Sequence, residues 1–329
     1  HDGEYILVAE DGASDLKNYP VNYVNGRIWV NNHAHVLQGK EKIANNKFLS
    51  YAMRLADIES VLVGGGRAKL TKGKMIEISI PIPPLHVQSE IVQILDNFTE
   101  LTAELTAELT ARKRQYTYYR DKLLTFEDGE VEYKLLGEVG QLIRGNGLPK
   151  TDFTETGIPA IHYGQIYTYY GTSTTETKSF VSSETAKKLK KVNKGDVVIT
   201  NTSENLEDVG KALTYLGEIE AVTGGHATIF KPGNDILGKY FTYYTQTSMF
   251  FSQKRKYAKG TKVTDVSATD LAKFQIPIPP LKEQERIVSI LDKFDTLTNS
   301  ISEGLPKEIK LRKQQYEYYR DLLLTFPKE

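Results

Sequence analysis

The stretch SIPIPPLHVQSEIVQILDNF, residues 79–98, recurs as QIPIPPLKEQERIVSILDKF at residues 275–294. A second matching pair follows, because RKRQYTYYRDKLLTF at 112–126 resembles RKQQYEYYRDLLLTF at 312–326. The copies are offset by 196 residues in the first pair and by 200 in the second. A repeat of this kind indicates one structural unit used twice. The predicted order along the chain is domain, helix, domain, helix.

The proline cluster in each copy predicts a boundary between a domain and a helix. Three prolines within residues 81–84 exclude helix there and favour an extended chain. Apolar residues then recur every three or four positions, which predicts helices of about 40 residues and about 60 Å. The second helix should kink or restart at EGLPKE, 303–308, because it contains Gly304 and Pro306. We expect the two helices to pack antiparallel as a coiled coil. The expected packing residues are Phe98, Leu101, Leu105, Leu109, Tyr116, Phe294, Leu297 and Tyr316.

The globular parts show short β-branched and aromatic runs punctuated by glycine, which predicts strands and loops. The predicted fold class is α+β, with two globular mixed α/β domains separated by the two helices in a pseudo-twofold repeat. The predicted segments are a first domain at 1–80, a central helix at 81–128, a second domain at 129–276 and a C-terminal helix at 277–329.

Two further expectations concern parts of these domains. The run at 156–171 is expected to be strands and loops, and 236–256 to be one amphipathic helix with a basic end. Carrying the repeat back to residue 1 lands near Asn193. We therefore expect the N-terminal part of the first domain, the counterpart of about 130–192, to be missing.

Composition narrows the class of protein. Lys and Arg together number 42 and so do Asp and Glu, so net charge alone predicts no polyanionic partner. The chain has no cysteine, which excludes disulfides and thiolate-rich metal sites and is typical of a reducing cytoplasm. No apolar run approaches the length of about 18 to 20 residues that spans a membrane. We expect a cytoplasmic protein with no membrane partner.

Catalytic motifs are lacking in the sequence. There is no phosphate-binding loop, no nucleophile elbow and no zinc-protease helix. His33 and His35 lie two apart on a predicted strand and could share a metal, but no acidic cluster accompanies them. We expect no metal site and no catalytic residue. His226, the counterpart of His33, is interpreted as a buried or hydrogen-bonded structural histidine, with a DNA-facing histidine as the alternative. An enzyme with an unrecognised site is the weakest alternative.

The remaining polar features favour nucleic-acid recognition, since basic residues among aromatics contact phosphates and Asn-rich loops reach base edges. The loop candidates for base or phosphate contact in the second domain are Arg144, Asn146, Lys150, Asn201, Ser203, Asn205 and Lys211. The phosphate candidates are Lys254, Arg255, Lys259 and Lys262, with Arg67, Lys69 and Lys72 in the first domain. The alternatives are an ordinary solvated surface, or a coiled-coil scaffold whose domains bind proteins or glycans. Salt-dependent DNA binding separates the scaffold from a DNA-binding protein.

This arrangement resembles the specificity subunit of type I restriction–modification enzymes over essentially the whole chain. The twin PIPPL boundaries at 81–85 and 277–281, the helix ends YYRDxLLTF and a repeated TAEL tetrapeptide carry the resemblance. It implies that each domain reads one half of a split, asymmetric target in double-stranded DNA. It also implies that the helices dock two adenine-methylating modification subunits, which restriction (translocase) subunits join. S-adenosylmethionine, ATP and Mg would then serve those partners, and this chain would bind no cofactor.

The tetrapeptide TAEL occurs at 102–105 and again at 106–109. Four helical residues advance about 6 Å and add a net rotation of about 40°. One base pair of DNA turns about 34 to 36° and advances about 3.4 Å, so the angular steps nearly match while the helical translation is larger. Adding four residues also keeps Leu101, Leu105 and Leu109 on one helix face. The hypothesis is that repeat number sets the non-specific spacer between half-sites.

Overall fold

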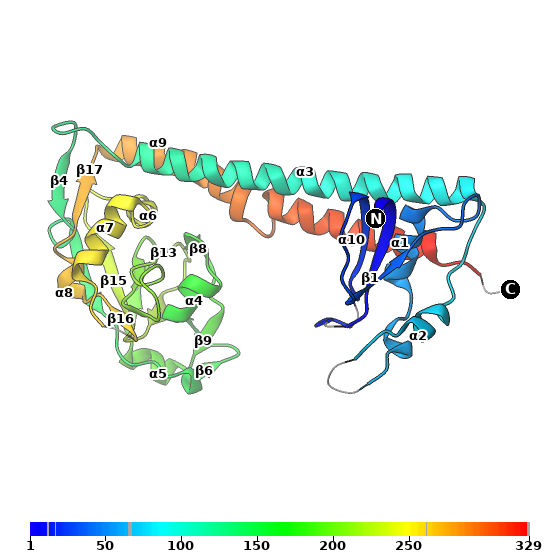
Figure 1. Ribbon diagram of the computed structural model, residues 1–329. Coiled ribbons are helices and arrows are strands. Elements are labelled where there is room, and N and C mark those ends of the chain that lie inside the picture. Colours follow the sequence, from blue (N-terminus) through cyan, green and yellow to red (C-terminus); the bar gives the residue numbers. More distant parts are fainter. Residues whose placement is uncertain (12, 17, 65–67, 261, 328–329) are drawn as a thin grey trace. The chain divides into compact units, whose positions relative to one another are not determined.

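The computed structural model describes residues 1–11, 13–16, 18–64, 68–260 and 262–327. The chain forms two compact units, and each combines one globular domain with parts of both helical segments (Figure 1). The first unit comprises His1–Glu108 and Leu305–Glu329, and the second comprises Leu109–Gly304. Along the chain, the boundary between the units therefore falls within the repeated tetrapeptides and at the predicted helix break.

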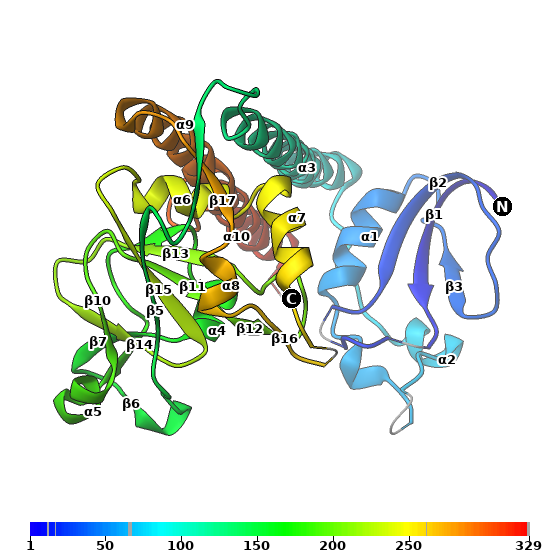
Figure 2. The same ribbon diagram turned by 90° about the vertical axis from the view of Figure 1, so that its left-hand side faces the viewer.

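The first unit contains a three-stranded antiparallel sheet in the order β2-β1-β3. Its helix α1 lies against β1 and β2 (Figure 2). The elements of this unit are β1 (Asp2–Ala9), β2 (Val21–Arg27), β3 (Ala34–Leu37), α1 (Asn46–Leu55), the 3-10 turn η1 (Glu59–Val61), α2 (Lys72–Ile76), the first part of α3 (Leu85–Leu123) and α10 (Gly304–Leu324).

Helix α1 is apolar on two faces, which explains its position between the sheet and the long helices. Met53 packs with Ile6 and Val8 of β1 in the core of the domain. Phe48, Tyr51 and Ala52 instead form a second cluster with residues of α3 and α10, namely Ile91, Leu95 and Leu324. The first domain is thus joined to the helices by buried apolar surface and not by a flexible contact.

The second unit has two five-stranded sheets, in the orders β5-β15-β11-β13-β8 and β10-β14-β7-β9-β6. Most of its strands are antiparallel, and β13–β8 and β14–β7 are parallel pairs. The strands are β4 (Glu132–Leu135), β5 (Gly140–Arg144), β6 (Phe153–Thr154), β7 (Ile158–Ile161), β8 (Ser173–Thr174), β9 (Ser179–Val181), β10 (Lys190–Val192), β11 (Val197–Thr200), β12 (Thr202–Ser203), β13 (Ala212–Tyr215), β14 (Ala221–Thr223), β15 (Ala227–Pro232), β16 (Thr264–Asp265) and β17 (Gln275–Ile278).

Helices of the second unit cover the first of these sheets on the side of the spacer. Phe241 and Phe250 pack over Phe230 of β15, in a core that also includes Ile287 and Leu291. A separate apolar cluster joins the two sheets, with Val198 and Ile229 on one side and Ile161 on the other. The helices are η2 (Lys150–Asp152), α4 (Tyr163–Thr168), α5 (Ser183–Lys188), α6 (Gly238–Tyr244), α7 (Ser248–Tyr257), α8 (Ala268–Leu271) and α9 (Leu281–Asn299).

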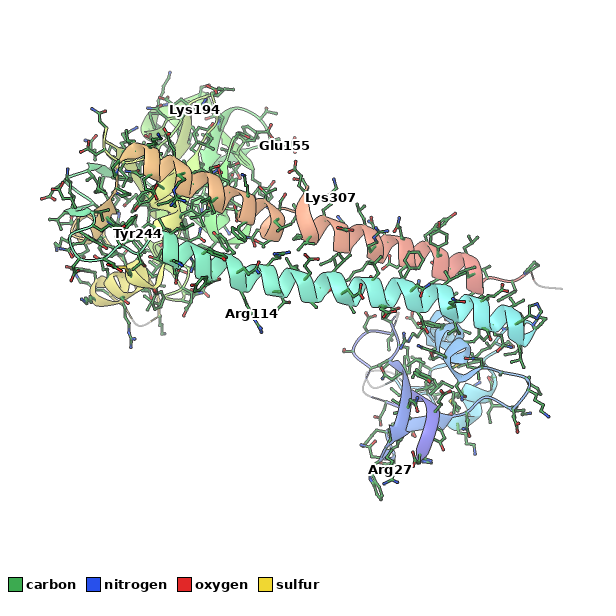
Figure 3. All side chains as sticks on the ribbon, turned by 90° about the horizontal axis from the view of Figure 1, so that it is seen from above. Arg27, Arg114, Glu155, Lys194, Tyr244 and Lys307 are labelled. Atoms are coloured by element: carbon green, nitrogen blue, oxygen red, sulfur yellow. The ribbon has the colours of Figure 1, made fainter. Side chains whose placement is uncertain are left out.

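The long helices confirm the predicted spacer. Helix α3 is continuous over 39 residues. The second helical segment is divided into α9 and α10, as the glycine and proline predict (Figure 3). Gly304 has φ of +73°, and a Cβ there would lie 2.4 Å from the carbonyl oxygen of Thr296. A side chain at this position would therefore clash where the chain turns between the two helices.

The pairing of the helices is antiparallel and reciprocal. Phe98 of α3 stacks on Tyr319 of α10 at 5.4 Å between ring centroids, and Tyr119 of α3 stacks on Phe294 of α9 at 5.8 Å. Because Phe98 and Phe294 are repeat counterparts, as are Tyr119 and Tyr319, the same contact is made twice with the helix roles exchanged. Tyr116 lies 6.4 Å from Phe294, and Tyr316 joins the apolar cluster of α1. Leu101, Leu105, Leu109 and Leu297 are partly buried.

The two domains have the same central arrangement of three strands and one helix. The order β2-β1-β3 corresponds to β13-β11-β15, and α1 corresponds to α6. In the first unit, Lys47 and Tyr51 of α1 bond the two carboxylate oxygens of Asp96 at 2.6 and 2.7 Å. In the second, Lys239 and Tyr243 of α6 bond Asp292 in the same way. Each domain is therefore fixed to its helix by the same polar triad.

Two local predictions are wrong. The single helix expected at 236–256 is divided into α6 and α7, because Thr247 accepts a hydrogen bond from the Phe250 amide and caps a new helix. The run at 156–171 contains α4 as well as β7. Helix α4 begins with a capping box, in which His162 is the N-cap and Gln165 is the third helical residue.

Candidate nucleic-acid interface

The candidate residues of the second domain occupy three segments. Arg144 ends β5, and Asn146 and Lys150 follow it. Asn201, Ser203, Asn205 and Lys211 lie between β11 and β13. The basic candidates from Lys254 to Lys262 lie at the end of α7 and in the chain that leads to β16.

One group of polar residues gathers at the ends of these segments, and we call it the recognition surface: Arg144, Asn146, Thr202, His226 and Asp265. The guanidinium of Arg144 donates to the carbonyl oxygen of Gly225 at 3.3 Å and lies 3.8 Å from the carboxylate of Asp265. Thr202 and Asp265 are paired residues of the β12–β16 ladder. The Thr202 hydroxyl lies 3.0 Å from Nδ1 of His226, which is exposed. Short strands thus present both donors and acceptors to solvent, as base readout requires.

Aromatic rings flank this surface. Tyr163 at the start of α4 lies 4.9 Å from the His226 ring, and His162 lies 4.5 Å from Tyr163. Burial lowers the pKa of His162, and the nearby Lys150 and His226 lower it further. Its Nδ1 accepts a hydrogen bond from the Gly164 amide at 3.2 Å and so caps α4. The rings were missed in the sequence because 156–171 was interpreted as strands. The signal that could have found them is the histidine followed three residues later by glutamine.

Two residues predicted to contact DNA have buried side chains, which the sequence did not predict. Asn201 is 0% exposed; its amide donates to the carbonyl oxygen of Val266 at 2.6 Å, and its oxygen accepts from Thr228. It joins β16 to the sheet and cannot reach a base. Lys254 is 4% exposed and donates to the backbone carbonyls of Glu207 and Val209. Ser203 is also largely buried, with its hydroxyl near the amide of Asn205.

The other candidates have varied surroundings. Asn146 donates to the carbonyl oxygen of Lys188 at 2.5 Å, although it remains exposed. Asn205 and Lys211 both bond Asp208 within one loop. Lys150, Arg255 and Lys262 are exposed, and Lys259 is exposed beside Asp270.

In the first domain Lys69 pairs with Asp11 at 3.3 Å, and Lys72 begins α2. A hydrogen bond from His33, reinforced by Lys69, holds the pKa of Asp11 below its ordinary value. His35 bonds the carbonyl oxygen of Leu70 instead of sharing a site with His33. Arg67 lies outside the described residues.

A cavity of about 570 Å³ lies in the second unit, between the 204–211 loop, α4, α7 and the long helices. Tyr167, Lys211, Phe251, Lys254 and Asp295 are among the residues that line it. Among the residues that the structure describes, no three His, Asp or Glu side chains are placed to hold a metal ion. No described helix is both long and apolar enough to cross a membrane.

Comparisons with known proteins agree on one family. The model described as the type I restriction modification DNA specificity domain matches residues 1–112 and 129–311. A putative type I restriction enzyme specificity subunit of Haemophilus influenzae is 40% identical over 99% of this chain and 84% of that protein. The EcoR124I/EcoR124II specificity subunit of Escherichia coli is 43% identical over 78% of this chain and 64% of that protein.

Solved structures show the same fold. A chain from a structure concerned with complex assembly and conformational transition of the type I system matches with a TM-score of 0.64 at 17% identity, over 98% of this chain and 82% of that chain. The HsdS subunit of Thermoanaerobacter tengcongensis matches with a TM-score of 0.54 at 18% identity, over 97% of this chain and 80% of that chain.

Proposed function

This chain belongs to the DNA specificity subunits of type I restriction–modification systems, and from that premise we propose that its two domains read the two halves of a split DNA target. Subunits of this family determine DNA specificity, are not catalytic and bind no cofactor themselves. The observation that carries the proposal is the reciprocal repeat, in which each domain is fixed to the spacer by the same Lys–Tyr–Asp triad. Two related domains joined by one helical spacer are suited to a DNA target with two separated half-sites. Because the domains differ outside the repeated motifs, the half-sites should differ as well.

We further propose that the long helices dock two adenine-methylating modification subunits, one for each repeat, and that restriction subunits join this core. S-adenosylmethionine, ATP and Mg would be used by those partners. The repeat supports this stoichiometry, since equivalent helix faces suit equivalent partners. Exposed side chains on both long helices remain available for such contacts; Arg114 of α3, for example, projects away from α9 (Figure 3).

The test is a map of methylated adenines in DNA from cells that carry this chain with its modification subunit. The expected result is a bipartite motif with two different half-sites and an unspecified spacer. Methylation at a continuous site, or none in the presence of the modification subunit, would contradict the proposal. Native mass spectrometry of the purified assembly would report the number of modification subunits.

Replacing Arg144 with alanine is expected to relax one half of the motif. A side chain that contacts a base edge contributes about 1–3 kcal/mol of discrimination, or roughly 5- to 150-fold in binding. The measurement is DNA binding by the assembled complex to the target and to single-base variants of each half. Lys150→Ala is the matched control, because loss of a phosphate contact weakens binding to all sequences alike and lowers the salt slope by about one. If Arg144→Ala instead weakens binding to all of these sequences equally, Arg144 contacts a phosphate group and not a base.

A further inference from the structure

Lys254 lies in a run of three basic residues in α7 and is the only one of the three that is buried. The side chains of Arg255 and Lys256 are exposed, whereas Lys254 is 4% exposed. Successive residues of a helix point about 100° apart, so one member of such a run can face inward while the others face solvent. Lys254 therefore needs an explanation different from that of its neighbours.

The buried ammonium group bonds the backbone of the 204–211 loop, which connects β12 to β13. Its Nζ donates to the carbonyl oxygen of Val209 at 2.8 Å and to that of Glu207 at 3.2 Å. Gly210 lies directly over the lysine stem, with φ of +76°, and a Cβ there would be 3.0 Å from Cδ of Lys254. The loop and the lysine side chain thus fit each other closely.

The burial of this charge is costly, which indicates that the ammonium group has a specific role. No described carboxylate forms an ion pair with Lys254, and its hydrogen-bond acceptors are the two carbonyl oxygens. Burial lowers the pKa of Lys254 to about 8, with partial compensation from Glu207 and Asp208 and a further lowering by Lys211. An apolar side chain would fill the same space without this penalty. What an apolar side chain cannot do is hold the two carbonyl groups.

The same loop presents polar groups to solvent, and two of them, Glu207 and Lys211, line the cavity that Lys254 also lines. Glu204, Asn205, Glu207 and Lys211 are exposed. Asn205 and Lys211 both bond the carboxylate of Asp208, at 2.9 and 2.6 Å, so the loop is internally ordered. Carboxylate and amide groups of this kind pair with the exocyclic amino groups of cytosine and adenine in the major groove.

We propose that Lys254 is a positioning residue for target recognition, whose ammonium group holds the 204–211 loop in the shape that reads one half-site. This inference rests on the proposed reading of DNA by the second domain. Lys254 does not touch DNA. It acts through its bonds to the loop backbone, and its loss should alter sequence discrimination without removing a phosphate contact.

The test compares Lys254→Met with Arg255→Met in the full chain assembled with its modification subunit. Methylation rates are measured on duplexes with the target and with single substitutions in each half. For Lys254→Met we expect discrimination to fall about tenfold in the half that Arg144→Ala relaxes and to stay unchanged in the other half. The salt slope of DNA binding should equal that of the wild type. Arg255→Met should leave discrimination in both halves unchanged.

Three results would overturn the inference: discrimination retained in both halves, an equal fall in both, or a salt slope lowered by about one, which would make Lys254 a phosphate contact. Gly210→Ala disturbs the same contact from the loop side and replaces Lys254→Met if that variant does not fold; it should relax the same half. If Arg144→Ala also leaves both halves intact, the proposed reading of DNA by this domain fails. If only the Lys254 and Gly210 variants are without effect, the inference alone fails.

Discussion

Deletion of Thr106–Leu109 is expected to shorten the unspecified spacer of the DNA target by one base pair and to leave both half-sites unchanged. Helix α3 runs without a break through this segment, so removing four residues shortens it by about 6 Å and rotates one end by about 40° relative to the other. The rotation nearly equals the turn of one base pair, about 34 to 36°. If the spacer became shorter by two base pairs, the DNA would turn about 30° more than the helix does. One of the two domains would then no longer face its groove.

The location of the repeat explains why the deletion should be tolerated. Within the chain, the first compact unit ends at Glu108 and the second begins at Leu109. The aromatic stacks of α3 lie outside the deleted segment, with Phe98 paired to Tyr319 and Tyr119 to Phe294. The other connection passes through the turn between α9 and α10, which can adjust where a continuous helix could not. Each unit therefore keeps its own packing when α3 is shortened by four residues.

The measurement is the methylated motif in cells that carry the deletion variant and the modification subunit. The matched control removes Ala107 alone. That change rotates the following leucines by about 100° away from the apolar face, so we expect methylation to be lost. An added TAEL should lengthen the spacer by one base pair. A deletion variant that methylates the wild-type motif with its spacer unchanged would refute the ruler hypothesis.

The spacer could be predicted from the sequence because its signals are local. Prolines exclude helix over a few residues, and apolar periodicity defines a helix face over one or two turns. The repeat then supplied the antiparallel pairing, since matching motifs imply matching contacts. The stack of Phe98 on Tyr319 and the stack of Phe294 on Tyr119 are such a pair of matching contacts.

The recognition residues could not be predicted equally well, because burial depends on partners distant in the chain. Lys254 and Arg255 are adjacent and similar in charge, yet only Lys254 meets the 204–211 loop. Asn201 is in an Asn- and Ser-rich run that is typical of a surface loop, but its amide bonds Val266, 65 residues away. Composition identified the segments near the recognition surface without showing which side chains face solvent.

A glutamine at the fourth position after the Pro-Pro pair in each copy is another polar side chain whose burial the sequence did not show. Gln88 and Gln284 occupy equivalent positions in the two copies, and both are 0% exposed. Gln284 accepts from the Leu237 amide at 2.9 Å and donates to the carbonyl oxygens of Asp235 and Pro279. Gln88 makes the corresponding three bonds to Asn45, Ile43 and Pro83. Each glutamine thus joins the start of a long helix to the segment that enters the domain helix, α6 or α1.

Replacing Gln284 with alanine is expected to lower the free energy of unfolding of the second domain by about 3 kcal/mol. The substitution removes three hydrogen bonds to the backbone, of which the one to the Pro279 carbonyl oxygen is fully buried and the other two are partly buried. A fully buried backbone group without its partner costs about 1–3 kcal/mol, and the partly buried groups add less. Hydrogen exchange is the suitable measurement, since it reports the stability of each domain separately. Amides of α6 should exchange about 100-fold faster, whereas those of α1 should be unaffected.

The repeat provides the matched variants for this prediction. Gln88→Ala should accelerate exchange in α1 and leave α6 unchanged, because the three bonds of Gln88 go to the segment that enters α1 and to Pro83, all within the first unit. Glu285→Ala alters an exposed neighbour in the same helix and should change neither domain. If Gln284→Ala resembles Glu285→Ala, the buried bonds contribute little and apolar packing around Ile287 and Leu291 alone fixes the second domain to its helix. If both glutamine variants destabilise both domains together, the two units unfold as one, and the domains are coupled through α3.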